Sequence, residues 1–229
     1  MDMTVLAADY TFEFGWVEAN LPIFFRAAFL TIQILVWSAV ISVAIGLVTG
    51  QMLLAKSAWL RIPARIYVDA FRLTPMIFQI VAIFFLLPIL FDISVPAFSS
   101  GVIALSLNYG AFFSEVFKAG VQSIEKGQWE AAQSMGISKT KTLVRIIYPQ
   151  ALKRMLPPIG NMLISLTKDT SLVSIIGVAE LFNTAQNVGA ATFRQIEVLV
   201  LVSVFYLVIN LPLAWQVERM NKRLNNDGR

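Results

Sequence analysis

Five stretches of the chain are long and apolar enough to cross a lipid bilayer, which leaves few folds open to it. A bilayer core is about 30 Å thick, so a helix that rises 1.5 Å per residue needs about 20 mostly apolar residues to cross it. Backbone polar groups in lipid must be bonded within the protein, and helices achieve this within each segment. We therefore expect an all-α, multi-pass membrane protein with five transmembrane helices, at residues 24–51, 66–91, 96–120, 156–177 and 196–215.

The composition agrees with a membrane protein and excludes several other classes. Apolar residues make up 57% of the chain and charged residues only 14%, so few charges remain to cover a soluble domain. The chain has no cysteine and no histidine, so it lacks the common metal ligands and the usual general base near pH 7. We expect a single transmembrane domain over residues 1–229, with no catalytic residue, no metal site and no cofactor bound by this chain.

Lysine and arginine are distributed very unevenly between the two sides of such a chain. Thirteen of the 18 fall in the loop after the first span, in the loop at residues 125–154 and in the C-terminal tail, whereas only Arg26 and Arg194 fall on the other side. Cytoplasmic loops of membrane proteins carry this excess of basic residues. We therefore expect the N-terminus outside and the C-terminus in the cytoplasm. Because orientation accounts for the basic residues, the expected partner is the lipid bilayer and not a nucleic acid.

The cytoplasmic loop at residues 125–154 is far longer than a tight turn, and its pattern predicts two short helices. Residues 128–135 are helix-forming and precede Gly136, which permits a bend and also suits a plain helix C-cap. Residues 138–148 begin with a serine suited to an N-cap and should end as a helix before Pro149. The second segment is amphipathic. Two interpretations remain open: a helix pair resting on lipid headgroups, or a docking element for a cytoplasmic partner.

Several motifs in and around this loop resemble one protein family. Glu130, Ala131 and Ala132 are followed by Gly136, Ile146 and Tyr148-Pro149 at a spacing similar to the EAA loop of membrane subunits of ATP-binding-cassette (ABC) importers. Further segments resemble the polar amino-acid subgroup: FRLTP at 71–75 followed by Gln79, SEVFKAG at 114–120, KGQWEAA at 126–132, YPQALKRMLP at 148–157 and KDTSL at 168–172. Tyr148 stands where leucine is usual, and Leu73 where glycine is common. Over residues 21–220 the chain is identified as a member of the histidine/glutamine-type permease subunits of type I ABC importers.

The resemblance implies a function that composition does not supply. It implies a permease subunit that moves a polar amino acid across a bacterial inner (plasma) membrane by alternating access, paired with itself or with a homologue. An extracytoplasmic binding protein would deliver the amino acid, and ABC ATPase subunits carrying ATP and Mg would dock on the EAA coupling helices between helices 3 and 4. The chain has no G-x-x-x-x-G-K phosphate loop, so it is not expected to be an enzyme itself. The residues expected to couple it to the ATPase are Glu130, Ala131, Ala132, Gly136 and Pro149.

Polar side chains recur at helical spacing within three of the predicted spans. Ionisable groups at membrane depth cost several kcal/mol unless they are paired or face water, so they are candidates for function. The three stripes are Asn161, Ser165, Lys168, Asp169 and Leu172 in the fourth span, Asn108, Ala111, Glu115, Lys118 and Gln122 in the third, and Arg72, Pro75 and Gln79 in the second. Pro75 should also kink the second span, because it frees a backbone carbonyl.

Each stripe has a structural and a functional interpretation. An internal ion pair of Glu115 with Arg72 or Lys118 is favoured over a ligand site, within an intramembrane polar network that includes Gln79. Lys168 is expected to be paired, with Asp169 of a second subunit as one candidate partner. Asp169, with Thr170 and Ser171, either faces the substrate ammonium near mid-membrane or forms a gate or subunit contact. Ser165, Asn161 and Lys168 belong to the same candidate pathway or gate.

Two functions of other classes are alternatives to an ABC permease subunit. An intramembrane enzyme would use Glu115 and Asp169 as paired carboxylates, but their expected depths differ by roughly 8–10 Å. The stronger alternative is an ATP-independent channel or secondary transporter for small polar solutes, although secondary transporters usually show internal repeats. Dependence on ATP and copurification of an ATPase distinguish these functions. The substrate amino acid, and whether the dimer is homo- or heteromeric, are left open by one sequence.

Overall fold

The computed structural model describes the backbone of residues 11–227, and every regular element in that range is helical, which confirms the all-α fold. In chain order the elements are α2 (Val17–Leu54), α3 (Ala58–Leu73), α4 (Met76–Val81), the π-helical η1 (Ala82–Leu86), α5 (Leu87–Phe91), α6 (Ala97–Gln122), α7 (Lys126–Ser134), α8 (Lys139–Thr142), the π-helical η2 (Leu143–Ile147), α9 (Tyr148–Asp169), the 3₁₀ helix η3 (Thr170–Ile176), α10 (Leu181–Thr192) and α11 (Gln195–Asp227). The single domain expected over residues 1–229 also includes residues 1–10 and 228–229, which lie outside the described residues.

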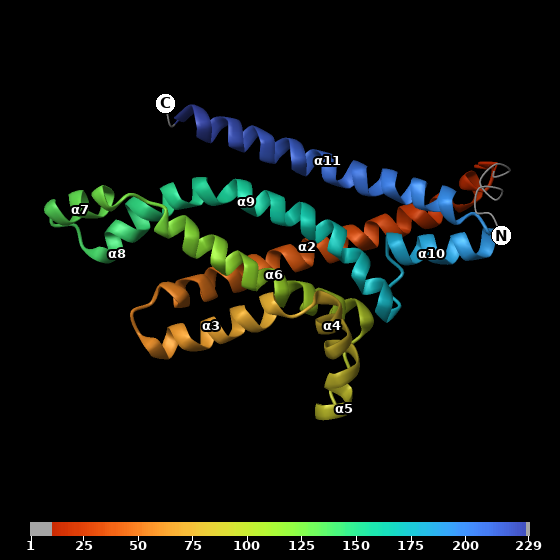
Figure 1. Cartoon of the computed structure of the whole chain (residues 1–229), viewed down its shortest axis with the longest axis horizontal. Coiled ribbons are helices and arrows are strands. Elements are labelled where there is room, and N and C mark those ends of the chain that lie inside the picture. Colours follow the sequence, from red (N-terminus) through yellow and green to blue (C-terminus); the bar gives the residue numbers. More distant parts are fainter. Residues whose placement is uncertain (1–10, 228–229) are drawn as a thin grey trace, which may run out of the picture.

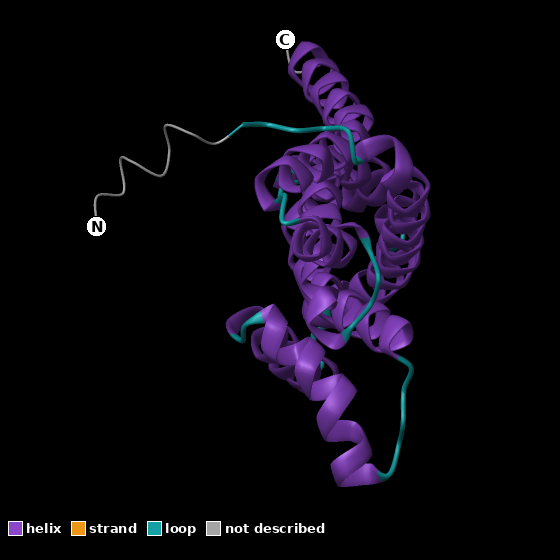
Figure 2. Cartoon of the chain, turned by 90° about the vertical axis from the view of Figure 1, so that its right-hand side faces the viewer, coloured by secondary structure: helices purple, strands orange, loops and turns teal. Residues whose placement is uncertain are grey.

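The long helices form one elongated bundle. α2, α6, α9 and α11 run along its long axis, whereas α4 and α5 project from its side (Figure 1). One end, which we call the loop end, carries α7 and α8, and the last turns of α11 lie on the same side (Figure 1). The other end carries the start of α2 and α10. Figure 2 looks along the long axis and shows the helices gathered around a common centre, with a smaller group extending from it.

α2 and α6 pack closely along the centre of the bundle, and small residues make this contact possible. A Cβ atom built on Gly46 would lie only 2.4 Å from Cβ of Phe113. Without a hydrophobic driving force between helices in lipid, such small residues allow backbones to approach and gain van der Waals contact. The largest buried cluster surrounds this contact and includes Ile34, Leu105 and Leu166. The centre of α6 is therefore fixed by packing from several sides.

The structure agrees only in part with five straight spans. Among the described residues, α2 and the part of α11 at Gln195–Lys222 are each long and apolar enough to cross a membrane. Two bent pairs of helices reach this length and apolarity only together: Ala58–Leu73 with Met76–Phe91, and Lys139–Ile176 with Leu181–Thr192. α6 coincides with the third predicted span but is not among these candidates, because it carries polar residues such as Ser106 and Asn108 into the core. The count of five is therefore not confirmed.

The second predicted span is broken rather than kinked. α3 and the following helix meet at an angle of 108° on either side of Thr74 and Pro75. Because Pro75 has no N–H, the carbonyl of Phe71 loses its helical partner. The side-chain amides of Gln79 and Asn108 replace it, each donating to the Phe71 carbonyl at 2.9 Å. The prediction that Arg72, Pro75 and Gln79 share one helical face is therefore wrong, since the helix does not continue through Pro75.

The Gln79 side chain satisfies several groups at this break. Its amide nitrogen also donates to the carbonyl and the hydroxyl of Thr74, at 3.2 and 2.8 Å. Its amide oxygen accepts from the Asn108 side chain of α6 at 3.1 Å. Gln79 is only 6% exposed and Asn108 5% exposed, so water cannot substitute for these bonds. The amide pair ties the sharp bend to the central helix.

The second short helix of the loop does not end before Pro149, contrary to the sequence prediction. α8 passes through η2 directly into α9, which has Pro149 in its first turn. Proline is tolerated in the first turn of a helix, where the missing N–H has the least consequence. The widened π-helical turn of η2 comes immediately before it. Helical structure therefore continues from the loop into the bundle.

α10 was not predicted from the sequence, and a buried carboxylate holds its first turn. Glu180 is fully buried and accepts from the backbone N–H groups of Phe182 and Asn183, at 2.9 and 2.7 Å. It also accepts from the Tyr206 hydroxyl of α11 at 3.1 Å. The N–H of Leu181 donates to Oγ1 of Thr31 in α2. Glu180 therefore caps α10 and joins it to α11.

Replacing Glu180 by alanine is expected to destabilise the chain by about 2–3 kcal/mol, because two helix N–H groups and a buried hydroxyl lose their acceptor. Glu180→Gln keeps an acceptor oxygen and should lose less. The midpoint of thermal unfolding in detergent measures both variants, with Glu218→Ala, an exposed position paired with Lys222, as control. Equal midpoints for Glu180→Ala and Glu218→Ala would contradict this capping role.

Candidate functional site

The first helix of the loop presents two different faces. Glu130 and Ala131 are exposed on α7, whereas Ala132 is only 1% exposed. On the inner side, half-buried Trp129 packs with a cluster that includes Phe117 and Ile147. The loop is also fastened by Arg154, whose guanidinium donates to the carbonyl of Ser123 at the end of α6. α7 is thus held against the bundle by one face and offers the other to solvent.

Gly136 makes the bend after α7, as the sequence predicts. Its N–H donates to the carbonyl of Gln133, and the N–H of Ile137 donates to the carbonyl of Ala132, both at 3.0 Å. This pair of bonds is the Schellman motif, which requires a left-handed residue at the glycine position. Gly136 has a φ of +70°, a conformation that costs a residue with a Cβ about 1–2 kcal/mol. Since a Cβ there would meet nothing within 4 Å, backbone conformation and not space demands the glycine.

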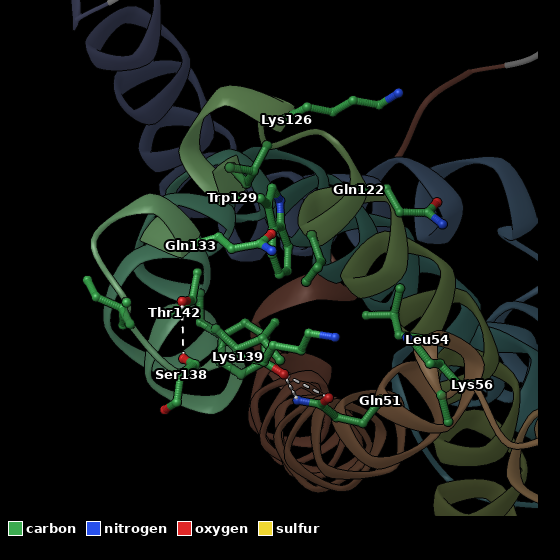
Figure 3. A pocket seen from close by; sticks show the side chains of 17 residues that line it. Gln51, Leu54, Lys56, Gln122, Lys126, Trp129, Gln133, Ser138, Lys139 and Thr142 are labelled. Atoms are coloured by element: carbon green, nitrogen blue, oxygen red, sulfur yellow. Dashed lines mark hydrogen bonds between the residues drawn. The ribbon is translucent and has the colours of Figure 1, made fainter. Parts of the chain in front are cut away.

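A cavity of about 930 Å³ lies between α7, α8 and the ends of α2 and α6. In Figure 3 the amine of Lys139 and the amide of Gln133 point into the space beside Trp129, whereas the Lys126 amine points away. The Tyr148 hydroxyl and the Gln51 amide are hydrogen-bonded at 2.6 Å on its wall (Figure 3). Tyr148 is the departure from the family pattern, and its hydroxyl gives this chain a link from the start of α9 to α2.

A cluster of charged residues surrounds Glu115 on α6. One carboxylate oxygen lies 3.0 Å from Arg65 and 3.7 Å from Arg72, and the other lies 3.4 Å from Lys118. Arg65 also pairs with Asp69 at 2.8 Å, and Arg72 lies 5.3 Å from the centre of the Phe112 ring. The cluster joins α3 to α6. With three cations and two carboxylates, its side chains carry a net positive charge.

Asp169 lies where α9 changes from an α-helix to a 3₁₀ helix. Its carboxylate accepts from the hydroxyl of Tyr109 on α6 at 2.7 Å. Thr170 is buried and donates to the carbonyl of Thr167, and the Ser171 hydroxyl donates to the carbonyl of Lys168. The two hydroxyls beside Asp169 are therefore engaged with their own helix.

The predicted pathway residues are not all brought together. Asn161, Ser165 and Lys168 are exposed along α9, and the even helical stripe stops at Asp169 because the 3₁₀ turn shifts Leu172. Glu115 and Asp169 bind different partners, through Arg65, Arg72 and Lys118 in one case and Tyr109 in the other. The structure does not pair the two carboxylates as an acid and a base.

Sequence reasoning missed several residues of these networks. Arg65 lies four residues before Asp69, and Asp69 lies three residues before Arg72, so their shared face was visible in the sequence. No sequence spacing indicated a role for Tyr109, because its hydroxyl bonds Asp169, which is 60 residues away in the chain. Nothing in the sequence indicated one for buried Glu197 either: the backbone N–H of Glu13 donates to it, and Arg194 lies 3.6 Å away.

Comparisons with known proteins place most of this chain within one group. The family described as "Binding-protein-dependent transport system inner membrane component" matches residues 42–226. The L-cystine transport system permease protein of Bacillus subtilis (strain 168) is 40% identical over 205 residues, covering 89% of this chain and 87% of that protein. The glutamine transport system permease protein of Escherichia coli (strain K12) is 37% identical over 221 residues, covering 93% of this chain and 98% of that protein.

The fold has counterparts among solved structures. The crystal structure of an amino acid ABC transporter with histidines matches with a TM-score of 0.88 and 30% identity, over 93% of this chain and 100% of that one. An inward-facing structure of the MetNI methionine ABC transporter matches with a TM-score of 0.72 over 89% of this chain and 98% of that one. At 18% identity this second likeness speaks for the fold alone.

Proposed function

Because the chain belongs to the family of binding-protein-dependent transport system inner membrane components, we propose that it is the permease subunit of an ATP-driven importer of a polar amino acid. The observation that carries this proposal is the likeness, over most of their length, to permeases named for cystine and glutamine transport. On this proposal the protein lies in the inner membrane of a bacterium, with its loop end in the cytoplasm. An extracytoplasmic binding protein delivers the amino acid, and a second permease subunit completes the pathway.

The geometry of α7 supports its role as the contact with the ATPase. Glu130 and Ala131 face solvent on a helix whose opposite face is anchored by Trp129 and Ala132. A small alanine allows a partner surface to approach closely, and Gly136 fixes the direction in which the chain leaves. ATP and Mg belong to the partner, and the energy of hydrolysis reaches this chain as a displacement of the loop. Pro149 then lies at the start of the long helix that receives this displacement.

The test of the proposal is reconstitution. The tagged chain, purified mildly, should bring an ABC ATPase with it. Proteoliposomes that hold this complex and the binding protein should take up a polar amino acid only when ATP is supplied. Thermal-shift screening of the binding protein against amino acids then identifies the substrate. Uptake at an unchanged rate without ATP would instead support the alternative of a channel or secondary transporter.

Two variants distinguish a charge role of Asp169 from a structural one. Asp169→Asn removes the charge but can still accept from Tyr109, whereas Tyr109→Phe removes the hydrogen bond and keeps the charge. If the carboxylate faces the substrate ammonium, Asp169→Asn should reduce uptake at least tenfold and Tyr109→Phe should reduce it much less. Uptake in proteoliposomes and copurification of the ATPase measure transport and assembly separately. The opposite order, or failure of Asp169→Asn to assemble, would assign Asp169 to a gate or subunit contact.

A further inference from the structure

The cavity at the loop end has a chemical character that coupling to an ATPase does not explain. Its 17 lining residues include three lysines, Lys56, Lys126 and Lys139, and none of these described lining residues is acidic. The Lys139 amine points into the space, whereas the Lys126 amine points away from it (Figure 3). Further donors come from the side chains of Gln122, Trp129, Gln133 and Ser138. Gln51 and Tyr148 also line the cavity but bond each other, and the Thr142 hydroxyl donates to the carbonyl of Ser138. A partly open cavity with the Lys139 amine and other donors, and without a carboxylate among its described lining residues, suits an anion.

Much of the remaining cavity wall is apolar. Leu54 of α2, Val121 and Ile124 near the end of α6, and Leu143 of η2 line it together with the Trp129 ring. In Figure 3 the Lys139 amine reaches across the space toward Leu54. A free inorganic anion would leave these apolar surfaces without a partner. A ligand with an anionic head and a hydrocarbon tail would contact both parts.

The proposed orientation places the cavity near the cytoplasmic membrane surface, where such a ligand is found. It adjoins the last turn of α2, the apolar helix that is long enough to span a membrane. Lys126, Trp129 and Gln133 recur at helical spacing on α7, whereas Ala131 lies on the opposite, exposed side. The cavity is therefore lined by the side of α7 away from Ala131, although Gly136, which we also assign to coupling, is one of its lining residues. Basic pockets at the cytoplasmic ends of membrane helices commonly bind anionic lipid headgroups.

We infer that this cavity binds an anionic phospholipid of the cytoplasmic leaflet, with the phosphate near Lys139 and an acyl chain along Leu54, Val121 and Leu143. The inference rests on the proposed orientation, in which the loop end faces the cytoplasm, but not on the transport of an amino acid. A lipid seated there contacts α2, α6, α7 and η2 at once. It would therefore hold the loop against the bundle, and the membrane's lipid composition would affect how firmly the loop is held.

Native mass spectrometry of the purified transporter complex tests the inference, with phosphatidylglycerol, phosphatidylcholine and inorganic phosphate as probes. Phosphatidylglycerol should bind the wild type more tightly than phosphatidylcholine, and inorganic phosphate should not displace it. A lysine near a membrane surface contributes about 1 kcal/mol to binding an anionic lipid, so Lys139→Gln should weaken phosphatidylglycerol binding about fivefold. Lys141→Gln is the matched control, because Lys141 lies on the same short helix, is exposed and does not line the cavity.

Four results would overturn the inference. Equal binding of the two lipids would remove the charge requirement, and equal loss in Lys139→Gln and Lys141→Gln would mean a general surface attraction. Displacement of phosphatidylglycerol by inorganic phosphate would identify a simple anion site. A complex that binds no phosphatidylglycerol through Lys139 would show that a partner subunit fills the cavity. Because uptake is measured separately, each of these results leaves the transport proposal standing.

Discussion

Replacing Gly136 by valine is expected to reduce amino-acid uptake at least tenfold while the chain still inserts into the membrane. The φ of +70° at Gly136 lies in the left-handed region, which costs an ordinary residue about 1–2 kcal/mol and a β-branched one more. Since 1.4 kcal/mol is tenfold in an equilibrium, the ratio of bent to unbent loop should fall at least about tenfold. Uptake and ATP hydrolysis in proteoliposomes measure the loss of coupling.

Gly136→Asn is the control at the same position, because asparagine tolerates the left-handed conformation. Gly136→Asn should retain much more uptake than Gly136→Val, although the asparagine and valine side chains are of similar size. Gly127→Ala is a second control, since Gly127 lies in the same loop, has open space around it and has no positive φ. If the Gly136→Val variant showed normal substrate-driven ATP hydrolysis and normal uptake, the bend would not be what couples ATP hydrolysis to transport. The same reasoning predicts uncoupling, to a smaller extent, for Gly136→Asp.

Replacing Gln79 by leucine is expected to destabilise the chain by about 3 kcal/mol, because each buried polar group left without a partner costs about 1–3 kcal/mol. The variant loses the donors to Phe71 and Thr74 and the acceptor for Asn108. The midpoint of thermal unfolding in detergent should fall by about 6–12 °C for a chain of this size. The bend beside Pro75 should be the first part to loosen, and amide hydrogen exchange near Thr74 should rise.

Gln186→Leu serves as the matched control for this prediction, because Gln186 is exposed on α10. The same amide-to-leucine change there should shift the midpoint by about 2 °C or less, as expected for a surface position. If both variants unfolded at the same temperature, the amide pair of Gln79 and Asn108 would not be what holds the break.

The parts of the fold that follow from local sequence could be predicted. Apolar length located the helical regions, and the helix-forming run before Gly136 predicted α7 and its bend. The spacing of Arg72, Glu115 and Lys118 also led to the expectation of ion pairing, and the structure places these charges within 3.7 Å. The bend and the Glu115–Lys118 pair depend on physics that acts over one or two turns of helix, which a sequence shows directly, whereas the Arg72–Glu115 pair joins α3 to α6.

The remainder depended on contacts between distant segments. The 108° break at Pro75 is stabilised by Gln79 together with Asn108 from another helix, and each donates to the Phe71 carbonyl. Nothing in the sequence around Glu180 indicated that its carboxylate would bond Tyr206 of another helix. The helix ran on through Pro149 because η2 widened immediately before it. The pattern of a single segment does not predict which side chain of a distant segment will contact it.

The unbroken helix through Pro149 has a mechanical consequence. From Lys139 to Ile176 the chain is helical throughout, a rod of about 55 Å at 1.5 Å per residue. One end of it carries the loop and the other carries Asp169 and the buried side chain of Val173. A tilt of about 5° at the loop would shift the far end of a rod of this length by about 5 Å. A small displacement of the loop can in this way move Asp169 and Val173 at the far end of the helix, with no relay of side-chain rearrangements between them.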